Sequence, residues 1–267
     1  MSRHYIIVQP QGGLCNRMRT IAGAYKLAQA LKKRLVVLWV RNSELNERFH
    51  HLFAPMPFRV IDDHPGSIIQ RWLWRIVSRT SYFTLIDDEK MLNSGWRDSS
   101  TLDWAKELVN NSLLICACHD IIKECDYSMF KPRDSIKNRC LVNINDKVIG
   151  IHIRRTDNEK SVSCSPTELF VQKMNEEIEA MEAVRFFLAT DAPKEEALLK
   201  ERYGNRIMIN PKTSLDRNNP IAIQEALLDL YSLSRCRRIY GSYYSSFSDV
   251  AAVWGNTDKI VLKAYDL

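Results

Sequence analysis

The sequence predicts an α/β fold with two domains, the second of which is a doubly wound parallel sheet. Two observations carry this prediction. A strand, a glycine turn, a helix and a second strand follow one another at the N-terminus, and five short apolar strands alternate with helices between residues 147 and 262. The chain has 267 residues, 45% hydrophobic and 26% charged, which is ordinary for a globular protein long enough to form two domains.

The N-terminal half opens with a βαβ unit. Tyr5–Val8 is apolar and predicts a short strand, and Gly12 and Gly13 then predict a turn. Residues 16–33 carry apolar side chains at helical spacing, and Leu35–Val40 predicts the next strand. Such a βαβ unit is right-handed by default.

Residues 42–137 show less regular patterning. Leu113–Cys116 predicts one buried strand, and residues 68–79 place tryptophans and arginines at helical spacing. We expect the domain boundary between residues 138 and 146, which gives domains of residues 1–143 and 144–267.

The C-terminal half is regular. Residues 147–153 form an apolar, β-branched run that predicts a buried strand. Ser165 and Glu168 then predict a capping box, which starts a helix reaching Met181. Further strands are predicted at 184–189, 206–209, 238–240 and 259–262, and further helices at 194–203, 221–236 and 248–254.

Charge and cysteine content narrow the class of protein. The net charge of +6 favours an anionic ligand, but no long Lys/Arg tract is present, so we expect no nucleic-acid partner. Seven cysteines without a CxxC pair predict reduced thiols and no structural zinc site. The N-terminal residues lack the apolar region of a signal peptide, and no apolar run spans a bilayer. We therefore expect a cytoplasmic protein.

Two arginines follow the strand that ends at Ile153. Arg154 and Arg155 present planar, permanently charged donor groups that suit phosphate, and Asp157 lies close behind. Polar loops also follow the predicted strands at 184–189 and 238–240. Because the carboxyl ends of parallel strands share one edge of a sheet, we expect these loops to converge on one ligand.

Each of these residues also has an ordinary structural explanation. Arg154 and Arg155 would pair with Asp157 on the surface, and His152 would be a core histidine. Asp191 and the serines Ser245, Ser246 and Ser248 would cap helices. The three loops together favour a nucleotide-type ligand over these explanations.

Four segments resemble the motifs of the fucosyltransferase superfamily, in the same order. They are Gly12–Met18, His152–Asp157 with its HxRRxD box, Ala189–Asp191 and Ser245–Phe247. This group includes α1,6-fucosyltransferases, nodulation fucosyltransferases and protein O-fucosyltransferases, which use GDP-fucose and invert the anomeric centre. The resemblance implies a GT-B-like architecture, in which two Rossmann-like domains face a cleft. Residues 1–143 would be the acceptor side and residues 144–267 the nucleotide-sugar side.

The resemblance also implies roles for individual residues. Arg154 would hold the β-phosphate of GDP and stabilise the leaving diphosphate, an electrostatic contribution that is often large. Arg155 would brace the loop, and His152 would contact guanine or ribose. Asp191 would accept hydrogen bonds from guanine. The diphosphate would be bound by Ser245, Ser246 and the backbone at Phe247, and the donor sugar by Gly13, Asn16 and Arg17.

The catalytic base is a point of departure from the family. In the α1,6 enzymes a glutamate follows the arginine box, whereas this chain has Val162 at that offset. Glu159 is then our first candidate base and Asp157 the second; the alternative for both is a solvent-facing acid. No metal or other cofactor is expected, because arginine and a helix N-terminus would neutralise the phosphates.

The sequence therefore predicts a bacterial enzyme of glycan biosynthesis that transfers fucose from GDP-fucose to a carbohydrate hydroxyl. The alternatives are a glycosyltransferase that uses another nucleotide sugar and a non-catalytic nucleotide- or glycan-binding protein. The segment 68–79 is compatible with peripheral contact at the inner face of a membrane, but we favour the explanation of a helix packed by its tryptophans, with arginines at the rim. The acceptor, the linkage and the oligomeric state are left open.

Overall fold

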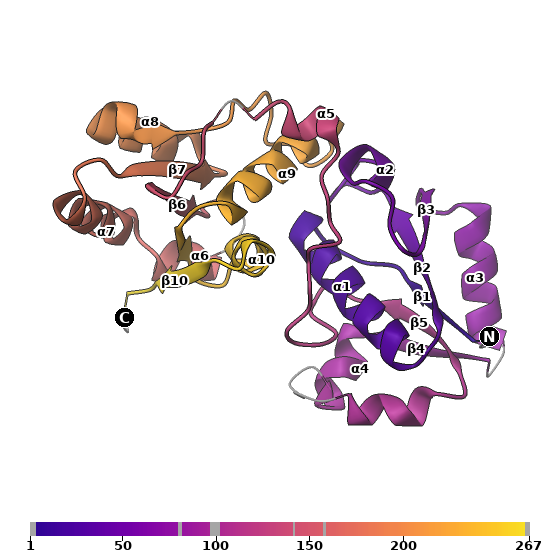
Figure 1. Ribbon diagram of the computed structural model, residues 1–267. Helices are drawn as coiled ribbons and strands as arrows, with labels where there is room; N and C mark the ends of the chain where they lie inside the picture. Colours follow the sequence, from indigo (N-terminus) through magenta and orange to yellow (C-terminus); the bar gives the residue numbers. More distant parts are fainter. Residues whose placement is uncertain (1–3, 80–81, 97–101, 141, 157–158, 265–267) are drawn as a thin grey trace. The chain divides into compact units, whose positions relative to one another are not determined.

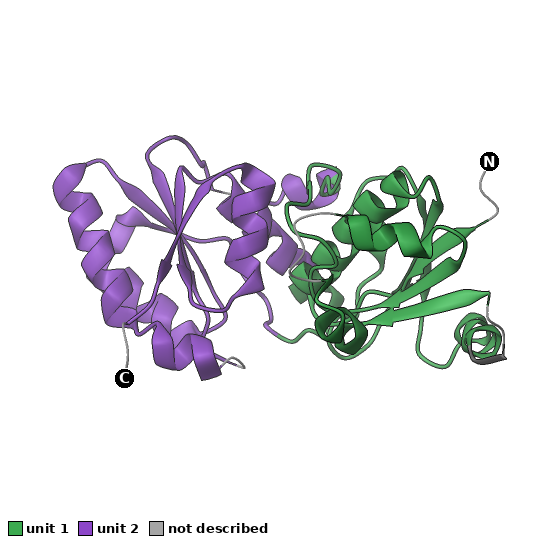
Figure 2. Cartoon of the chain, turned by 90° about the horizontal axis from the view of Figure 1, so that it is seen from below, with its two compact units in different colours: residues 1–133, 216–223 green, residues 134–215, 224–267 purple. Residues whose placement is uncertain are grey.

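The computed structural model describes residues 4–79, 82–96, 102–140, 142–156 and 159–264 (Figure 1). The chain forms two compact units, coloured separately in Figure 2. Unit 1 comprises residues 1–133 and 216–223, and unit 2 comprises residues 134–215 and 224–267. Among the described residues, no helix combines the length and the apolar character needed to cross a bilayer.

The passage from unit 1 to unit 2 lies ten residues before the boundary predicted at 143. The segment after Asp134 belongs to unit 2 because Arg139 reaches Glu225, with Nη2 3.2 Å from Oε1. Residues 216–223 belong to unit 1, where the carbonyl of Arg217 accepts the backbone N–H of Asn46 at 3.1 Å. Such contacts join segments far apart in the sequence.

Unit 1 contains a five-stranded parallel sheet in the order β3-β2-β1-β5-β4. Its strands are β1 (Tyr5–Val8), β2 (Arg34–Val40), β3 (Arg59–Asp63), β4 (Phe83–Asp87) and β5 (Ser112–Cys116). Its helical segments are α1 (Leu14–Ala30), α2 (Phe49–Leu52), α3 (Ile68–Arg79), α4 (Asp88–Asn93) and the 3₁₀ segment η2 (Asp103–Leu108). The predicted βαβ unit is β1-α1-β2, and β3 and β4 are strands that the sequence pattern did not indicate.

Helix α3 packs on the sheet through aliphatic side chains. Leu73 is buried in a cluster with Leu38 and Leu114, and Val77 adds to it. Trp72 and Trp74 are instead 64% and 40% exposed. The explanation of this segment as a helix packed by its tryptophans is therefore wrong, because α3 contacts the sheet through Leu73 and Val77 instead.

Unit 2 contains the predicted doubly wound parallel sheet, in the order β10-β9-β6-β7-β8. Its strands are β6 (Val148–Ile153), β7 (Arg185–Thr190), β8 (Ile207–Met208), β9 (Arg238–Ser242) and β10 (Asp258–Leu262). Its helical segments are α5 (Asp134–Lys137), α6 (Glu159–Cys164), α7 (Thr167–Ala180), α8 (Pro193–Tyr203), η3 (Gly204–Arg206), α9 (Pro220–Ser234) and α10 (Ser246–Gly255). All five predicted strands are present. The first residues of α9 lie in the segment 216–223, which belongs to unit 1.

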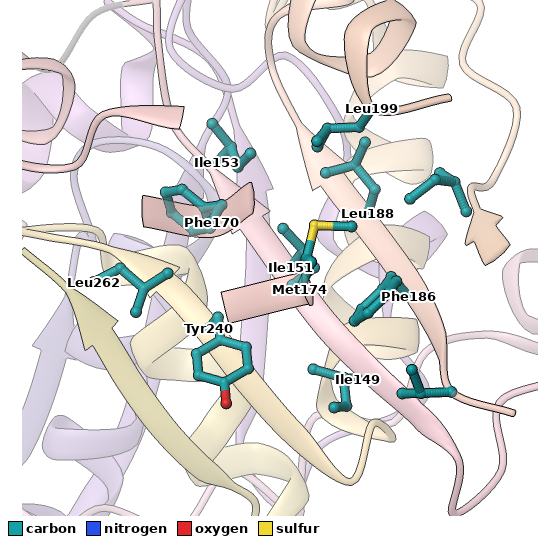
Figure 3. Packing of buried hydrophobic residues seen from close by; sticks show 12 residues of the cluster. Ile149, Ile151, Ile153, Phe170, Met174, Phe186, Leu188, Leu199, Tyr240 and Leu262 are labelled. Carbon is teal, nitrogen blue, oxygen red and sulfur yellow. The ribbon is translucent and has the colours of Figure 1, made fainter. Parts of the chain in front are cut away.

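Strand β6 lies at the centre of unit 2 and is buried along its whole length. Figure 3 shows Ile149, Ile151 and Ile153 of β6 packed among side chains from neighbouring strands and helices. Gly150 points to the other face, where a Cβ would lie 2.5 Å from Leu233 of α9. This rigid central strand fixes the loop that follows it.

Candidate functional site

The site in unit 2 lies where the strand order of the sheet reverses. From β6 the chain proceeds to β7 and β8 on one side, and it then returns to β9 on the other side of β6. The loops after β6 and β9 therefore leave the sheet in opposite directions. Open α/β sheets bind ligands at such a point, outside the carboxyl ends of the strands.

Ser242, the last residue of β9, ties these two loops together. Its buried hydroxyl donates to the His152 carbonyl at 3.3 Å, and its oxygen accepts the backbone N–H of Arg154 at 3.1 Å. Sequence reasoning missed this residue. A short polar side chain at the end of a buried strand was the available signal.

Arg154 and Asp191 form an ion pair at the carboxyl ends of β6 and β7, with Nε 3.1 Å from Oδ2. The Asp191 carboxylate also accepts the backbone N–H of Arg155 at 2.8 Å and the hydroxyl of Thr156 at 2.7 Å. Both of its oxygens are thus engaged by the arginine loop. The Arg154 side chain is 22% exposed, so solvent reaches it in spite of this pairing.

Arg155 is bound within unit 2. Its Nε donates to Glu195 at 2.9 Å, its Nη1 donates to the Arg154 carbonyl at 2.9 Å, and its Nη2 donates to the Ser165 carbonyl at 2.9 Å. These partners come from the start of α8, the arginine loop and the segment before α7. The guanidinium therefore holds three parts of the chain together, in the manner of a brace.

His152 is buried, and its ring stacks on Phe247 of α10 with centroids 4.9 Å apart and planes 17° apart. Burial, followed by the positive charge of Arg154, lowers the pKa of His152 to about 3. The ring is therefore neutral at physiological pH. Its Nδ1 has no hydrogen-bond partner among the described residues.

The N-terminus of α10 follows β9 at the same edge. Ser245 precedes the helix without making a side-chain capping bond, and Ser246 is the first helical residue. Ser248 donates to the Ser245 carbonyl at 3.3 Å. Because the first N–H groups of a helix lack intrahelical partners and carry the positive end of its dipole, this terminus suits an anion.

Of the two candidate bases, the structure describes only Glu159. Glu159 is the first residue of α6 and is exposed. Asp157 lies outside the described residues.

A buried acid in unit 2 was missed by sequence reasoning. Asp229 of α9 is fully buried, which raises its pKa, and its Oδ2 lies 3.1 Å from Nζ of Lys212. The positive charge of Lys212 also lowers the pKa of His152, so this pair lies within electrostatic reach of the predicted site. Asp229 lies between Leu228 and Leu230 in the predicted helix 221–236. A buried acid without a partner would be costly there, so this position in an apolar stretch was the available signal.

The unit 1 candidates lie around the turn from β1 to α1. Gly12 has φ +76°, and a Cβ there would lie 2.9 Å from Asn16 Nδ2, so the turn requires glycine. Gly13 caps α1 with an extended backbone. Asn16 accepts a hydrogen bond from Arg19 Nη2 at 2.9 Å.

Arg17 is placed differently from its predicted role at the donor sugar. Its side chain is fully buried and donates to the carbonyls of Gly12 and Val40, each at 2.7 Å, and burial lowers its pKa to about 10. The guanidinium also lies over the ring of Trp39. With its donors used inside unit 1, Arg17 stabilises the turn and does not present itself to a ligand.

The capping box predicted before α7 is not formed. Ser165 instead donates to the Leu262 carbonyl at 2.5 Å and accepts the backbone N–H of Tyr243 at 2.8 Å. Pro166 takes the N-cap position without a side-chain bond. Ser165 therefore connects α7 to the ends of β9 and β10.

No family model and no curated protein matches the sequence. Solved structures do match the fold. The α-1,6-fucosyltransferase NodZ, soaked with GDP-fucose, is 19% identical over 95% of this chain and 93% of its own, with a TM-score of 0.61. A mutant of Arabidopsis thaliana FUT1 in complex with GDP is 12% identical over 98% of this chain and 70% of its own, with a TM-score of 0.60.

POFUT1 in its apo form is a third similar structure, 10% identical over 97% of each chain, with a TM-score of 0.57. These likenesses extend over both units. The chain therefore has the GT-B-like α/β fold of these fucosyltransferases.

Proposed function

We propose that this chain is an inverting glycosyltransferase that transfers fucose from GDP-fucose to a carbohydrate hydroxyl. The observation that carries the proposal is Arg154, held by Asp191 and Ser242 at the point where the sheet order of unit 2 reverses. A permanently charged side chain in that place suits the diphosphate of a nucleotide sugar. The shared fold with NodZ, solved after soaking with GDP-fucose, supports this donor.

In the proposed reaction, the acceptor oxygen attacks C1 of fucose from the face opposite the diphosphate. The bond between C1 and the β-phosphate oxygen breaks, GDP leaves, and the acceptor proton passes to a base or to water. Arg154 and the N-terminus of α10, at Ser245, Ser246 and Phe247, would neutralise the charge that develops on the leaving diphosphate. No metal is needed for that step in this scheme.

The nucleoside part of the donor would lie beside His152. The neutral ring would contact guanine or ribose, and its buried Nδ1 has no hydrogen-bond partner among the described residues. Asp191, which we predicted to accept from guanine, already accepts bonds from the arginine loop at both oxygens. We assign it instead to positioning Arg154.

The remaining roles stay predictions from the family resemblance. Glu159 is the candidate base that the structure describes, exposed at the start of α6. Gly13 and Asn16 would contact the donor sugar, and we place the reaction in the bacterial cytoplasm, in glycan biosynthesis.

Thermal stabilisation by GDP, GDP-fucose, GDP-mannose, UDP and UDP-glucose tests the donor, because a ligand that binds the native state raises Tm by mass action. We expect shifts with the GDP compounds alone. A shift with the UDP compounds alone would point to a glycosyltransferase with another nucleotide sugar. Binding of GDP-fucose with neither hydrolysis of the donor nor transfer of sugar to any glycan in an array would favour the non-catalytic alternative.

Arg154→Ala provides the sharper test. It should abolish the GDP shift while leaving the Tm of the ligand-free protein close to that of the wild type. Arg237→Ala is the matched control, since Arg237 is an exposed arginine at the opposite end of the sheet, before β9. An unchanged GDP shift in Arg154→Ala would remove the basis of the proposal.

A further inference from the structure

A cluster of three different donor side chains lies at the carboxyl ends of β4 and β5 in unit 1. Asp88 follows β4 directly, and Cys118 and His119 come shortly after β5. The two strands pair in parallel, with Asp87 opposite Cys116, so the register of the sheet brings these positions together. A carboxylate oxygen, a thiol sulfur and a ring nitrogen all lie within 4.8 Å of one another.

The contacts converge on one nitrogen. His119 Nδ1 lies 2.8 Å from Asp88 Oδ1 and 3.3 Å from Cys118 Sγ. The backbone N–H of Cys118 donates to the other carboxylate oxygen, Asp88 Oδ2, at 2.9 Å, which fixes the carboxylate in place. The Asp88 carboxylate accepts hydrogen bonds from the Nδ1–H of His119 and from the thiol of Cys118, so the three side chains already meet at one point. A cation between the three atoms would replace these hydrogen bonds with direct bonds to the same donor atoms.

We propose that Asp88, Cys118 and His119 form a binding site for a divalent cation of the zinc type. Zinc accepts sulfur, nitrogen and oxygen at about 2.0–2.3 Å, and a tetrahedral centre with these bonds separates its donor atoms by roughly 3.3–3.6 Å. The observed distances of 2.8 and 3.3 Å are close to that spacing, so small side-chain movements would admit the ion.

The chemistry of the donor set selects the metal. A thiolate and an imidazole favour zinc, cobalt or copper over magnesium or calcium, which prefer oxygen ligands. On binding, the thiol would release its proton to solvent while Nδ1 offers its lone pair and Nε2 keeps the ring proton. One thiolate and one carboxylate then balance the two positive charges of the ion.

The cluster is open on one side. The side chains of Asp88 and His119 are 35% and 32% exposed, which leaves room for water as a further ligand. Arg19 lies nearby, but its guanidinium pairs with Asp120, with Nη1 3.2 Å from Oδ2, so it does not present an uncompensated positive charge. The ion would clamp the start of α4 to the segment after β5.

This site is independent of the proposed function, because every ligand comes from unit 1 and the diphosphate site lies in unit 2. Its test therefore needs no donor sugar. Titration of the full chain with Co²⁺ reports thiolate ligation through a charge-transfer band and tetrahedral geometry through visible d–d bands. We expect both bands to saturate at one equivalent and to be displaced by Zn²⁺.

Cys118→Ser should abolish the charge-transfer band, and His119→Gln should weaken Co²⁺ binding by at least about tenfold. Cys164→Ser is the matched control, since Cys164 is a half-buried cysteine of unit 2, and it should keep both bands. Zn²⁺ should raise the Tm of the wild type and of the control, but not that of Cys118→Ser. Absence of the bands in the wild type, or their persistence in both Cys118→Ser and His119→Gln, would overturn the proposal.

Discussion

Arg154 and Asp191 meet at the ends of two neighbouring strands. Ile153 of β6 is paired with Thr190 of β7, and each of the two charged residues comes next in its own segment. The sheet register therefore sets the separation of 3.1 Å between Arg154 Nε and Asp191 Oδ2. In consequence, the orientation of the proposed phosphate-binding arginine depends on an acid that need not touch the ligand.

Asp191→Asn tests this dependence. The amide keeps the shape of the side chain but loses the charge that holds Arg154, and hydrogen bonds to charged groups contribute about 1.5–3 kcal/mol. We expect GDP affinity to fall by roughly 10- to 150-fold, as measured by calorimetric titration. Glu196→Gln is the control and should bind GDP normally, since Glu196 is a half-buried acid of α8 that pairs with Lys200. Normal binding by Asp191→Asn would show that Arg154 orients itself without help.

Removal of the Arg155 side chain should destabilise the folded protein much more than removal of the Arg154 side chain. Arg155 donates to Glu195 and to two carbonyls, so Arg155→Ala removes three hydrogen bonds from partly buried groups, although Glu195 keeps the Thr167 hydroxyl and the Arg154 carbonyl keeps the Ser161 hydroxyl. We expect a loss of about 3–5 kcal/mol in the free energy of unfolding, measured by urea denaturation. Arg154→Ala should change this free energy by less than about 1 kcal/mol. Equal losses in the two variants would contradict the division of roles.

His152 should make the folded state sensitive to acid. Its pKa is about 3 in the folded chain and near 6.5 in the unfolded chain, so between these values only the unfolded chain gains the proton. The free energy of unfolding should therefore fall by about 1.4 kcal/mol per pH unit as the pH drops below 6.5, with no contribution above it.

His152→Gln should remove this slope, whatever its effect on stability at neutral pH. The measurement is urea denaturation of both proteins at several pH values between 4 and 8, and the difference between them is the contribution of His152. Parallel curves for the two proteins would show that the ring is not held neutral by burial.

Helix α3 should bring the protein to anionic membranes. Ile68 and Trp72 are 76% and 64% exposed, and Arg71 and Arg75 are exposed on the same helix, which has no acidic residue. Apolar and cationic side chains on one exposed helix suit a lipid surface, where each arginine adds about 1 kcal/mol. We expect the chain to co-sediment with phosphatidylglycerol vesicles and to dissociate as the salt concentration rises.

Ile68→Ser combined with Trp72→Ser should reduce this co-sedimentation several-fold. Leu198→Ser, which changes an exposed leucine of α8 in unit 2, is the control and should have no effect. Equal sedimentation with neutral phosphatidylcholine vesicles would argue against the charge contribution, and no sedimentation with either lipid would exclude membrane contact through α3.

The strands marked most clearly in the sequence are the buried ones of unit 2, although the largely exposed β10 was also predicted, from its apolar residues 260–262. All six residues of β6 are buried, and β7 and β9 are nearly so, so apolar runs mark them. Strands β3 and β4 escaped prediction because they are only partly buried and end in acids, at Asp63 and Asp87. Neither β3 nor β4 contains more than two consecutive apolar residues, whereas β10 contains three, so only β10 could be distinguished from a loop.

The site was predictable as far as it depends on strand ends, and not where it depends on long-range contacts. Arg154 and Asp191 follow strands, and the parallel sheet alone brings them together. The burial of Arg17 depends on the carbonyl of Val40, 23 residues away, and the hydroxyl of Ser165 is taken by Leu262, 97 residues away. Local patterns such as a glycine turn or a capping box contain no information about such partners.

The division of the chain into units affects how this fold can be recombined. Unit 1 is completed by residues 216–223, which are encoded within the stretch that otherwise forms unit 2, and the Asn218 carbonyl there accepts a hydrogen bond from Asn46 Nδ2 at 3.1 Å. A single genetic crossover near residue 133 would join a foreign N-terminal unit to a native segment 216–223. A functional chimaera will therefore require exchange of both residues 1–133 and residues 216–223. The two units are accordingly expected to be inherited together and not exchanged singly by recombination.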